Sequence, residues 1–253
     1  MNAYTTIANI RAIDATLSNV NDDVLLNTVV SASRLVDHLA RREFFVHRAT
    51  KQYTIASYAV DIDDLLVVES VKVITGDIET TLTSDDYELR TLNNRPPYTW
   101  ITLKSQYRGT LEITGWFGAG NLELQSPFVS LGVTCTCDEA ATELNFTSAS
   151  IARGDMIRID DEIMRVESVG SKSITVRRAQ NGTTAAAHTN SIVLVPLYPD
   201  IVRSCTNYIA VALLRKVQSA GLSTERLGDY SYSSDADTLS FAEHALYSVR
   251  RMR

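Results

Sequence analysis

The stretch from Asn21 to Phe45, NDDVLLNTVVSASRLVDHLARREFF, decides the fold that the sequence predicts. Apolar or small residues recur there every three or four positions, the spacing of one helical face: Leu25, Val29, Ala32, Val36 and Leu39. Asn21 or Asp22 can cap the first turn, and Arg41 and Arg42 lie where cations suit the negative end of a helix. The stripe predicts a long amphipathic helix, which must bury this face against partners elsewhere in the chain.

The composition is that of a soluble globular protein. The chain has 253 residues, of which 45% are hydrophobic and 21% charged, enough for one large domain or two small ones. We find neither a membrane-spanning apolar run nor a secretory signal, and therefore expect synthesis and folding in a cytoplasm. Three cysteines, Cys135, Cys137 and Cys205, fit a reducing compartment. The net charge of −6 argues against general affinity for DNA phosphates.

Periodicity divides the rest of the chain into helical ends and a β-rich middle. Residues 5–17 predict a short helix, and helical spacing returns after Pro199 and again after a polar link from Ser223 to Asp237. Between these ends, short alternating runs separated by turn residues predict strands, for example at 53–55, 65–68, 71–74, 100–103 and 111–114. Residues 128–196 contain further predicted strands, with hairpin signals at 160–162 and 181–182.

These patterns predict an α+β fold, a helical bundle from both chain ends with a central antiparallel β region and an inserted small β-domain. Residues 1–127 and 197–253 would form one domain of helices and strands, and residues 128–196 the insert.

Two quoted segments, AYTTIANIRAIDATL at 3–17 and NDDVLLNTVVSASRLVDHLARREF at 21–44, resemble the opening of bacteriophage head–tail connector (adaptor) proteins. The shared pattern is a short helix, a polar turn, an acidic cap, and a helix with an Ala/Ser centre that closes on Arg-x-Phe. Here that closure is Arg42-Glu43-Phe44. The 128–196 segment resembles a small β-module that recurs in phage structural proteins.

The resemblance implies a structural virion protein of the phage neck at the head–tail junction, and no enzyme. It implies a dodecameric ring that docks on the portal protein, extends the DNA channel and joins a stopper or tail/neck protein. DNA would pass through without specific binding, as the acidic balance also favours. No membrane and no cofactor are expected.

No catalytic, cofactor-binding or metal-binding motif is visible in the sequence. Cys135-x-Cys137 lacks the second ligand pair of a zinc site, so packing is the better interpretation, and we interpret His188 as structural. Basic clusters are candidates for docking an acidic partner, with solvated surface as the simpler interpretation: Arg250, Arg251, Arg253, Arg177 and Arg178. The tips of the insert's hairpins are Asp160, Asp161, Asn181 and Gly182.

Two other classes of function stay open. One is a β-rich binding or decoration module of the virion, for example one that binds carbohydrate. The other is a hydrolase that uses the paired carboxylates of Asp160 and Asp161. The sequence leaves open the ring stoichiometry, the neighbours, and whether the insert faces the tail, the outside or the channel.

Overall fold

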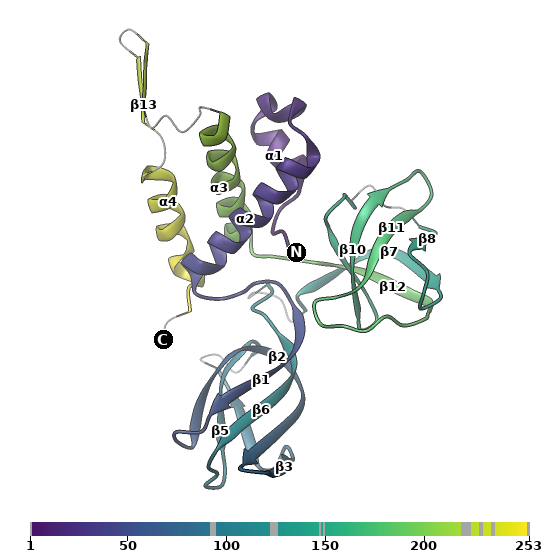
Figure 1. The fold of residues 1–253 in the computed structure, drawn as a ribbon, viewed down its shortest axis with the longest axis vertical. Helices are drawn as coiled ribbons and strands as arrows, with labels where there is room; N and C mark the ends of the chain where they lie inside the picture. The colour runs from purple at the N-terminus through teal and green to yellow at the C-terminus, as the bar shows by residue number, and fades with distance from the viewer. Residues whose placement is uncertain are drawn as a thin grey trace.

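The computed structural model describes residues 2–91, 95–121, 126–146, 148, 150–218, 224–227, 230–233 and 236–251. Figure 1 shows three lobes: a cluster of helices, a first sheet below it (sheet A) and a second sheet beside both (sheet B). None of the helices within these ranges is long and apolar enough to cross a membrane.

The helical lobe is built from both ends of the chain. Its helices are α1 (Ile7–Ile13), the 3₁₀ turn η1 (Ala15–Asn19), α2 (Asp22–Ala40), α3 (Asp200–Gln218), α4 (Ala236–Leu246) and the 3₁₀ turn η2 (Tyr247–Val249). Thr6 caps α1 by accepting from the Asn9 N–H. The predicted cap of α2 is confirmed at Asn21, which accepts from the Asp23 N–H. Helix α2 is shorter than the predicted stretch, because Arg41 adopts a left-handed conformation with φ of 54°.

The apolar stripe of α2 is buried against α3 and α4. Leu25, Val29, Ala32 and Val36 share one core with side chains of α1 and α3 and with Leu246 of α4. An ion pair between Arg215 and Asp14, 3.0 Å long, further joins α3 to the segment before η1.

Sheet A is an antiparallel sheet with strand order β1-β6-β2-β5-β4, in which β3 also pairs with β2. Its strands are β1 (His47–Thr54), β2 (Ala59–Thr75), β3 (Ile78–Leu82), β4 (Tyr87–Arg90), β5 (Tyr98–Leu103) and β6 (Thr110–Phe117). Two separately predicted strands, 65–68 and 71–74, are parts of the one long strand β2. Alternate residues of these strands build a core of their own, including Ile62, Leu65, Ile101 and Ile113.

Sheet B has the strand order β7-β12-β9-β10-β11-β8 and a separate apolar core. Its strands are β7 (Phe128–Cys137), β8 (Glu143–Leu144), β9 (Met156–Ile159), β10 (Glu162–Val169), β11 (Ile174–Gln180) and β12 (His188–Pro196). A two-stranded sheet, β13 (Thr224–Leu227) and β14 (Tyr230–Ser233), lies between α3 and α4 in the chain. It projects away from the helical lobe in Figure 1. The sequence predicts only a polar link there.

The predicted fold class is wrong. The chain is mostly β, with 40% strand and 27% helix, and is not a helical bundle from both ends with β material added. The physical reason is that two six-stranded antiparallel sheets each bury a core, so strands outweigh helices in the described chain. The four α-helices of the described ranges form the smaller part.

Side chains from sheets A and B fill a small core between them, formed by Val46, Trp116, Phe128, Met156 and Ile163. The guanidinium of Arg158 lies 4.7 Å from the Trp116 ring centre and 5.0 Å from that of Phe128, a cation–π contact on both sides. The two sheets are therefore packed directly on one another.

Candidate functional site

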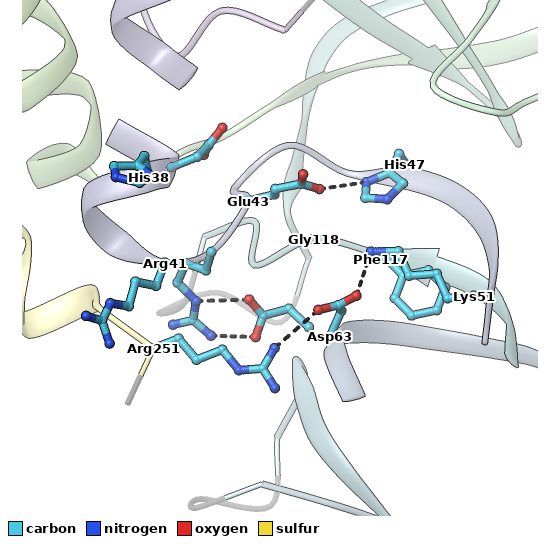
Figure 2. A pocket seen from close by; sticks show the side chains of 12 residues that line it. His38, Arg41, Glu43, His47, Lys51, Asp63, Phe117, Gly118 and Arg251 are labelled. Carbon is cyan, nitrogen blue, oxygen red and sulfur yellow. Dashed lines mark hydrogen bonds and ion pairs between the residues drawn. The ribbon is translucent and has the colours of Figure 1, made fainter. Parts of the chain in front are cut away.

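A highly charged cavity lies where the helical lobe meets sheet A. It has a volume of about 310 Å³ and is lined by the end of α2, the start of β1, the bend of β2 and the returning C-terminal segment. Figure 2 shows the side chains that line it. We call this cavity the junction pocket; its charged or ionisable lining residues are Asp37, His38, Arg41, Arg42, Glu43, His47, Lys51, Asp63, Asp64 and Arg251.

A buried bidentate ion pair forms one wall of the junction pocket. Arg42 donates from Nε and Nη2 to the two carboxylate oxygens of Asp64, at 3.0 and 2.6 Å. The side chains are only 10% and 5% exposed. The left-handed turn at Arg41 brings Arg42 off the helix and over sheet A. A pair this buried holds only when its geometry is good, so it fixes the angle between α2 and β2.

Arg251 lies beside this ion pair and ties the C-terminal segment to sheet A (Figure 2). Its side chain is 7% exposed and reaches Asp61 Oδ1 at 2.6 Å and Asp63 Oδ1 at 3.6 Å. The same guanidinium donates to the Ile62 carbonyl, and the Arg251 backbone N–H donates to the Ala40 carbonyl at 3.0 Å. One residue thus joins β2, the end of α2 and the end of η2.

Lys51 is also paired with a carboxylate, and His47 lies beside one. Lys51 Nζ lies 3.0 Å from Asp63 and 4.8 Å from the centre of the Phe117 ring, and His47 Nδ1 lies 3.9 Å from Glu43. Burial lowers the pKa of His47, so its ring is neutral at pH 7. Because Arg42, Lys51 and Arg251 are each paired with a carboxylate, the junction pocket is suited to holding the lobes in position.

A second network joins the N-terminal segment to α2. The Tyr4 hydroxyl donates to Asp37 and accepts from the Phe44 and Phe45 backbone N–H groups. Burial raises the pKa of Asp37 to about 6, with Arg34 opposing the rise. Burial likewise raises the pKa of Tyr4.

A buried ionic cluster lies in sheet B. Arg178 donates to both oxygens of Glu162, at 2.7 and 2.6 Å, and their side chains are 8% and 1% exposed. His188 lies between two carboxylates, with Nδ1 2.8 Å from Asp160 and Nε2 3.1 Å from Glu162. Both ring nitrogens are occupied and the side chain is 1% exposed, so His188 offers no free nitrogen to a substrate. This arrangement fits the structural role that the sequence predicts.

The hairpin tip at Asn181 and Gly182 faces the interior of the molecule. The Asn181 amide donates to Asn2 and to the Val46 carbonyl, both at 2.9 Å, and the Asn181 carbonyl accepts from the Arg48 N–H at 2.8 Å. A tip of sheet B therefore packs on β1 and on the N-terminal segment.

The other predicted site residues are more accessible. Arg177 is 64% exposed beside Glu167, and Asp161 is 87% exposed beside Arg158. Arg250 is half-buried, and Arg253 lies outside the described residues. Docking of a partner by the basic side chains stays a prediction. Arg178 and Arg251 are already paired with carboxylates inside the molecule.

Sequence reasoning missed the residues that hold the lobes together, above all Tyr4, Asp37, Arg42 and Asp64. Only Arg42 carried a signal, as part of the Arg-x-Phe closure. Among the residues described, no group of three or more His, Cys, Asp or Glu side chains could hold a metal ion. Burial raises the pKa of Cys135 to about 11, so this thiol is protonated and unsuited to nucleophilic attack.

Comparison with known proteins finds no matching family model, no similar curated protein and no similar solved structure.

Proposed function

We propose that the chain is a structural protein of a phage neck, an adaptor whose copies form a ring on the portal, extend the DNA channel and join head to tail. The resemblance at residues 3–17 and 21–44 is the origin of the proposal. The structural observation that supports it most is the projecting hairpin β13–β14, which pairs with no other strand of the described chain.

A two-stranded hairpin on its own is marginally stable in water and needs further strands or a packed surface. A second copy of the chain can supply that surface. A contact of one patch with a different patch on the next copy is head-to-tail, and such contacts close into a ring when the rotation closes. The proposal takes this ring to be dodecameric, with the stopper or tail protein bound to it.

The paired charges of the junction pocket also favour a positional role over a chemical one. Arg42, Asp64 and Arg251 hold three segments in fixed relation. The net charge of −6 favours passage of DNA without adhesion, and we expect acidic side chains to outnumber basic ones on the channel wall.

Imaging of the virus that encodes the chain tests the proposal directly. Cryo-electron microscopy of purified particles should show a ring of this fold between portal and tail. Particles that lack the protein, or a channel wall lined mostly by basic side chains, would contradict the proposal. A monomer in solution would not contradict the proposal, since a ring component can stay monomeric until the portal is present as a template.

A further inference from the structure

A second cavity lies at the far end of sheet A. The register places His47 opposite Phe117 at the helical end of the sheet and Thr54 opposite Thr110 at the other end (Figure 1). At that far end, residues 55–58, Leu103 and residues 105–108 line a cavity of about 530 Å³. This volume is within the range of small-ligand sites, roughly 300–1,000 Å³.

The cavity has an apolar floor and two aromatic side chains. Leu103 is 2% exposed and Ile55 is half-buried, and both pack in or against the core of sheet A. Tyr107 is half-buried against the same core, whereas Tyr58 is 54% exposed. Exposed tyrosine is a common ligand contact because its ring offers apolar area at low entropic cost and its hydroxyl can form hydrogen bonds.

Two polar side chains of the cavity are unused, whereas the Ser57 hydroxyl donates to the Ala59 carbonyl at 2.7 Å. Gln106 and Arg108 are exposed, and within the described part of the chain their side chains have no hydrogen-bond or ion-pair partner. The backbone beneath them is held: Thr75 Oγ1 donates to the Arg108 carbonyl at 2.6 Å, and the Ile55 N–H donates to the Gly109 carbonyl at 3.0 Å. Fixed loops carrying free polar groups lower the entropic cost of binding.

The charge of the cavity is opposite to that of the chain. Arg108 is the charged residue among the described lining residues, and no carboxylate lines the cavity, although the chain as a whole has a net charge of −6. A guanidinium without a partner matches the two oxygens of a carboxylate in a bidentate pair.

We propose that this cavity binds an acidic saccharide, a sugar that carries a carboxylate. The apolar face of the sugar ring would stack on Tyr58, Gln106 would bond to neighbouring hydroxyls, and Arg108 would pair with the carboxylate. The inference goes beyond the neck role and does not depend on it.

Saturation-transfer NMR and calorimetry with the full chain test this site. The probes are sialyllactose and trigalacturonate, with lactose as the neutral control. We expect the acidic sugars to bind more tightly than lactose. Arg108→Ala should weaken acidic sugars roughly tenfold and leave lactose unchanged, whereas Tyr58→Ala should weaken every sugar that binds. Tyr247→Ala is the control, because Tyr247 is 63% exposed in the helical lobe.

The outcomes separate clearly, since Tyr58 and Arg108 are exposed and their variants should melt as the parent does. No transfer from either acidic sugar at about 10 mM would overturn the inference. Equal binding of acidic and neutral sugars, or binding that Arg108→Ala leaves unchanged, would also overturn it. Absence of the chain from virus particles would leave it standing.

Discussion

Gly182 illustrates how a single residue fixes the contact between two lobes. It has φ of +76°, and a Cβ at this position would lie 2.0 Å from the Arg48 carbonyl oxygen of β1. We predict that Gly182→Ala lowers the free energy of unfolding by about 2–4 kcal/mol, because both the backbone conformation and the packing resist a side chain. Chemical denaturation monitored by fluorescence measures the loss.

Gly132→Ala is the matched control for this prediction. Gly132 has a similar φ of +72°, but an added Cβ there meets nothing within 4 Å. The control should cost about 1 kcal/mol, the price of a left-handed conformation alone. Equal losses in the two variants would show that the contact with Arg48 does not matter.

Asp155 makes stability depend on pH. Burial raises its pKa to about 6 from 3.8, while the Ala152 N–H opposes the rise. The folded state therefore binds more protons than the unfolded state between these values, so stability falls as pH rises from about 4 to about 6. We predict that Asp155→Asn removes this fall and raises stability at pH 7 by about 1–3 kcal/mol.

Thermal melts of both proteins from pH 4 to pH 8 provide the measurement. Asp37 also has a pKa raised to about 6, so the variant should keep a smaller slope of the same sign. A variant less stable than the parent at pH 7 would show that the Ala152 hydrogen bond outweighs the burial of the charge.

At the scale of elements, Arg251 should matter more than its neighbour. Its buried guanidinium ties the C-terminal segment to β2, whereas Arg250 makes no ion pair with any described side chain. We predict that Arg251→Ala costs about 2–4 kcal/mol and Arg250→Ala less than about 0.5 kcal/mol. Hydrogen exchange should show the loss as faster opening of α4. Similar exchange in both variants would refute the assigned contact.

Sheet B also has two adjacent arginines that differ in burial, Arg177 and Arg178 of β11, and the buried Arg178 is paired with Glu162 of β10. Burial would raise the pKa of Glu162, but hydrogen bonds from Arg178 and two backbone N–H groups hold it below its ordinary value. Glu162→Gln should cost about 3 kcal/mol at pH 7 because it leaves a buried guanidinium without its anion. The parent should lose this contribution as pH falls through the lowered pKa of Glu162.

Arg177→Ala is the control for that substitution, since the 64%-exposed Arg177 side chain should contribute less than about 0.5 kcal/mol. Urea unfolding at pH 7 compares the two. A loss for Arg177→Ala as large as that for Glu162→Gln would contradict the difference in burial.

Single elements were the most predictable part of the structure. Periodicity located α2 and most strands, because a face that must be buried leaves its spacing in the sequence. It divided β2 in two, since Ser70 and Glu69 interrupt the apolar run without breaking the strand. Hydrogen bonds between distant residues leave no such spacing, and the partners of Arg251 and Asn181 were therefore invisible.

At the scale of the whole molecule, the prediction of fold class failed for a related reason. The long amphipathic helix has the clearest local pattern, but pattern strength does not measure how much of the chain an element organises. Short strands with weak individual signals pair into two sheets, each of which buries a core of its own. Which strands would pair, and that residues 128–196 would pack on Trp116, depended on contacts far apart in sequence.

The proposed ring predicts a separation between folding and assembly. Replacing residues 224–233 by a short flexible link should remove β13 and β14 while leaving the cores of the three lobes intact. We expect an unchanged melting temperature within about 2 °C and loss of ring formation on portal-bearing particles. Ile78→Ser, at a 69%-exposed site on β3, is the surface control. Rings that form without the hairpin would show that other surfaces suffice.

The pairing of α2 with α3 also sets the order in which the chain can fold. Helix α2 ends at Ala40 and its partner begins at Asp200, and both sheets lie between them. During synthesis, sheets A and B can form while the apolar stripe of α2 still faces solvent, because helices α3 and α4, which bury it, have not yet been translated. The helical lobe must therefore be the last to complete its packing. Until then the chain exposes the apolar face of α2, to which a chaperone would bind.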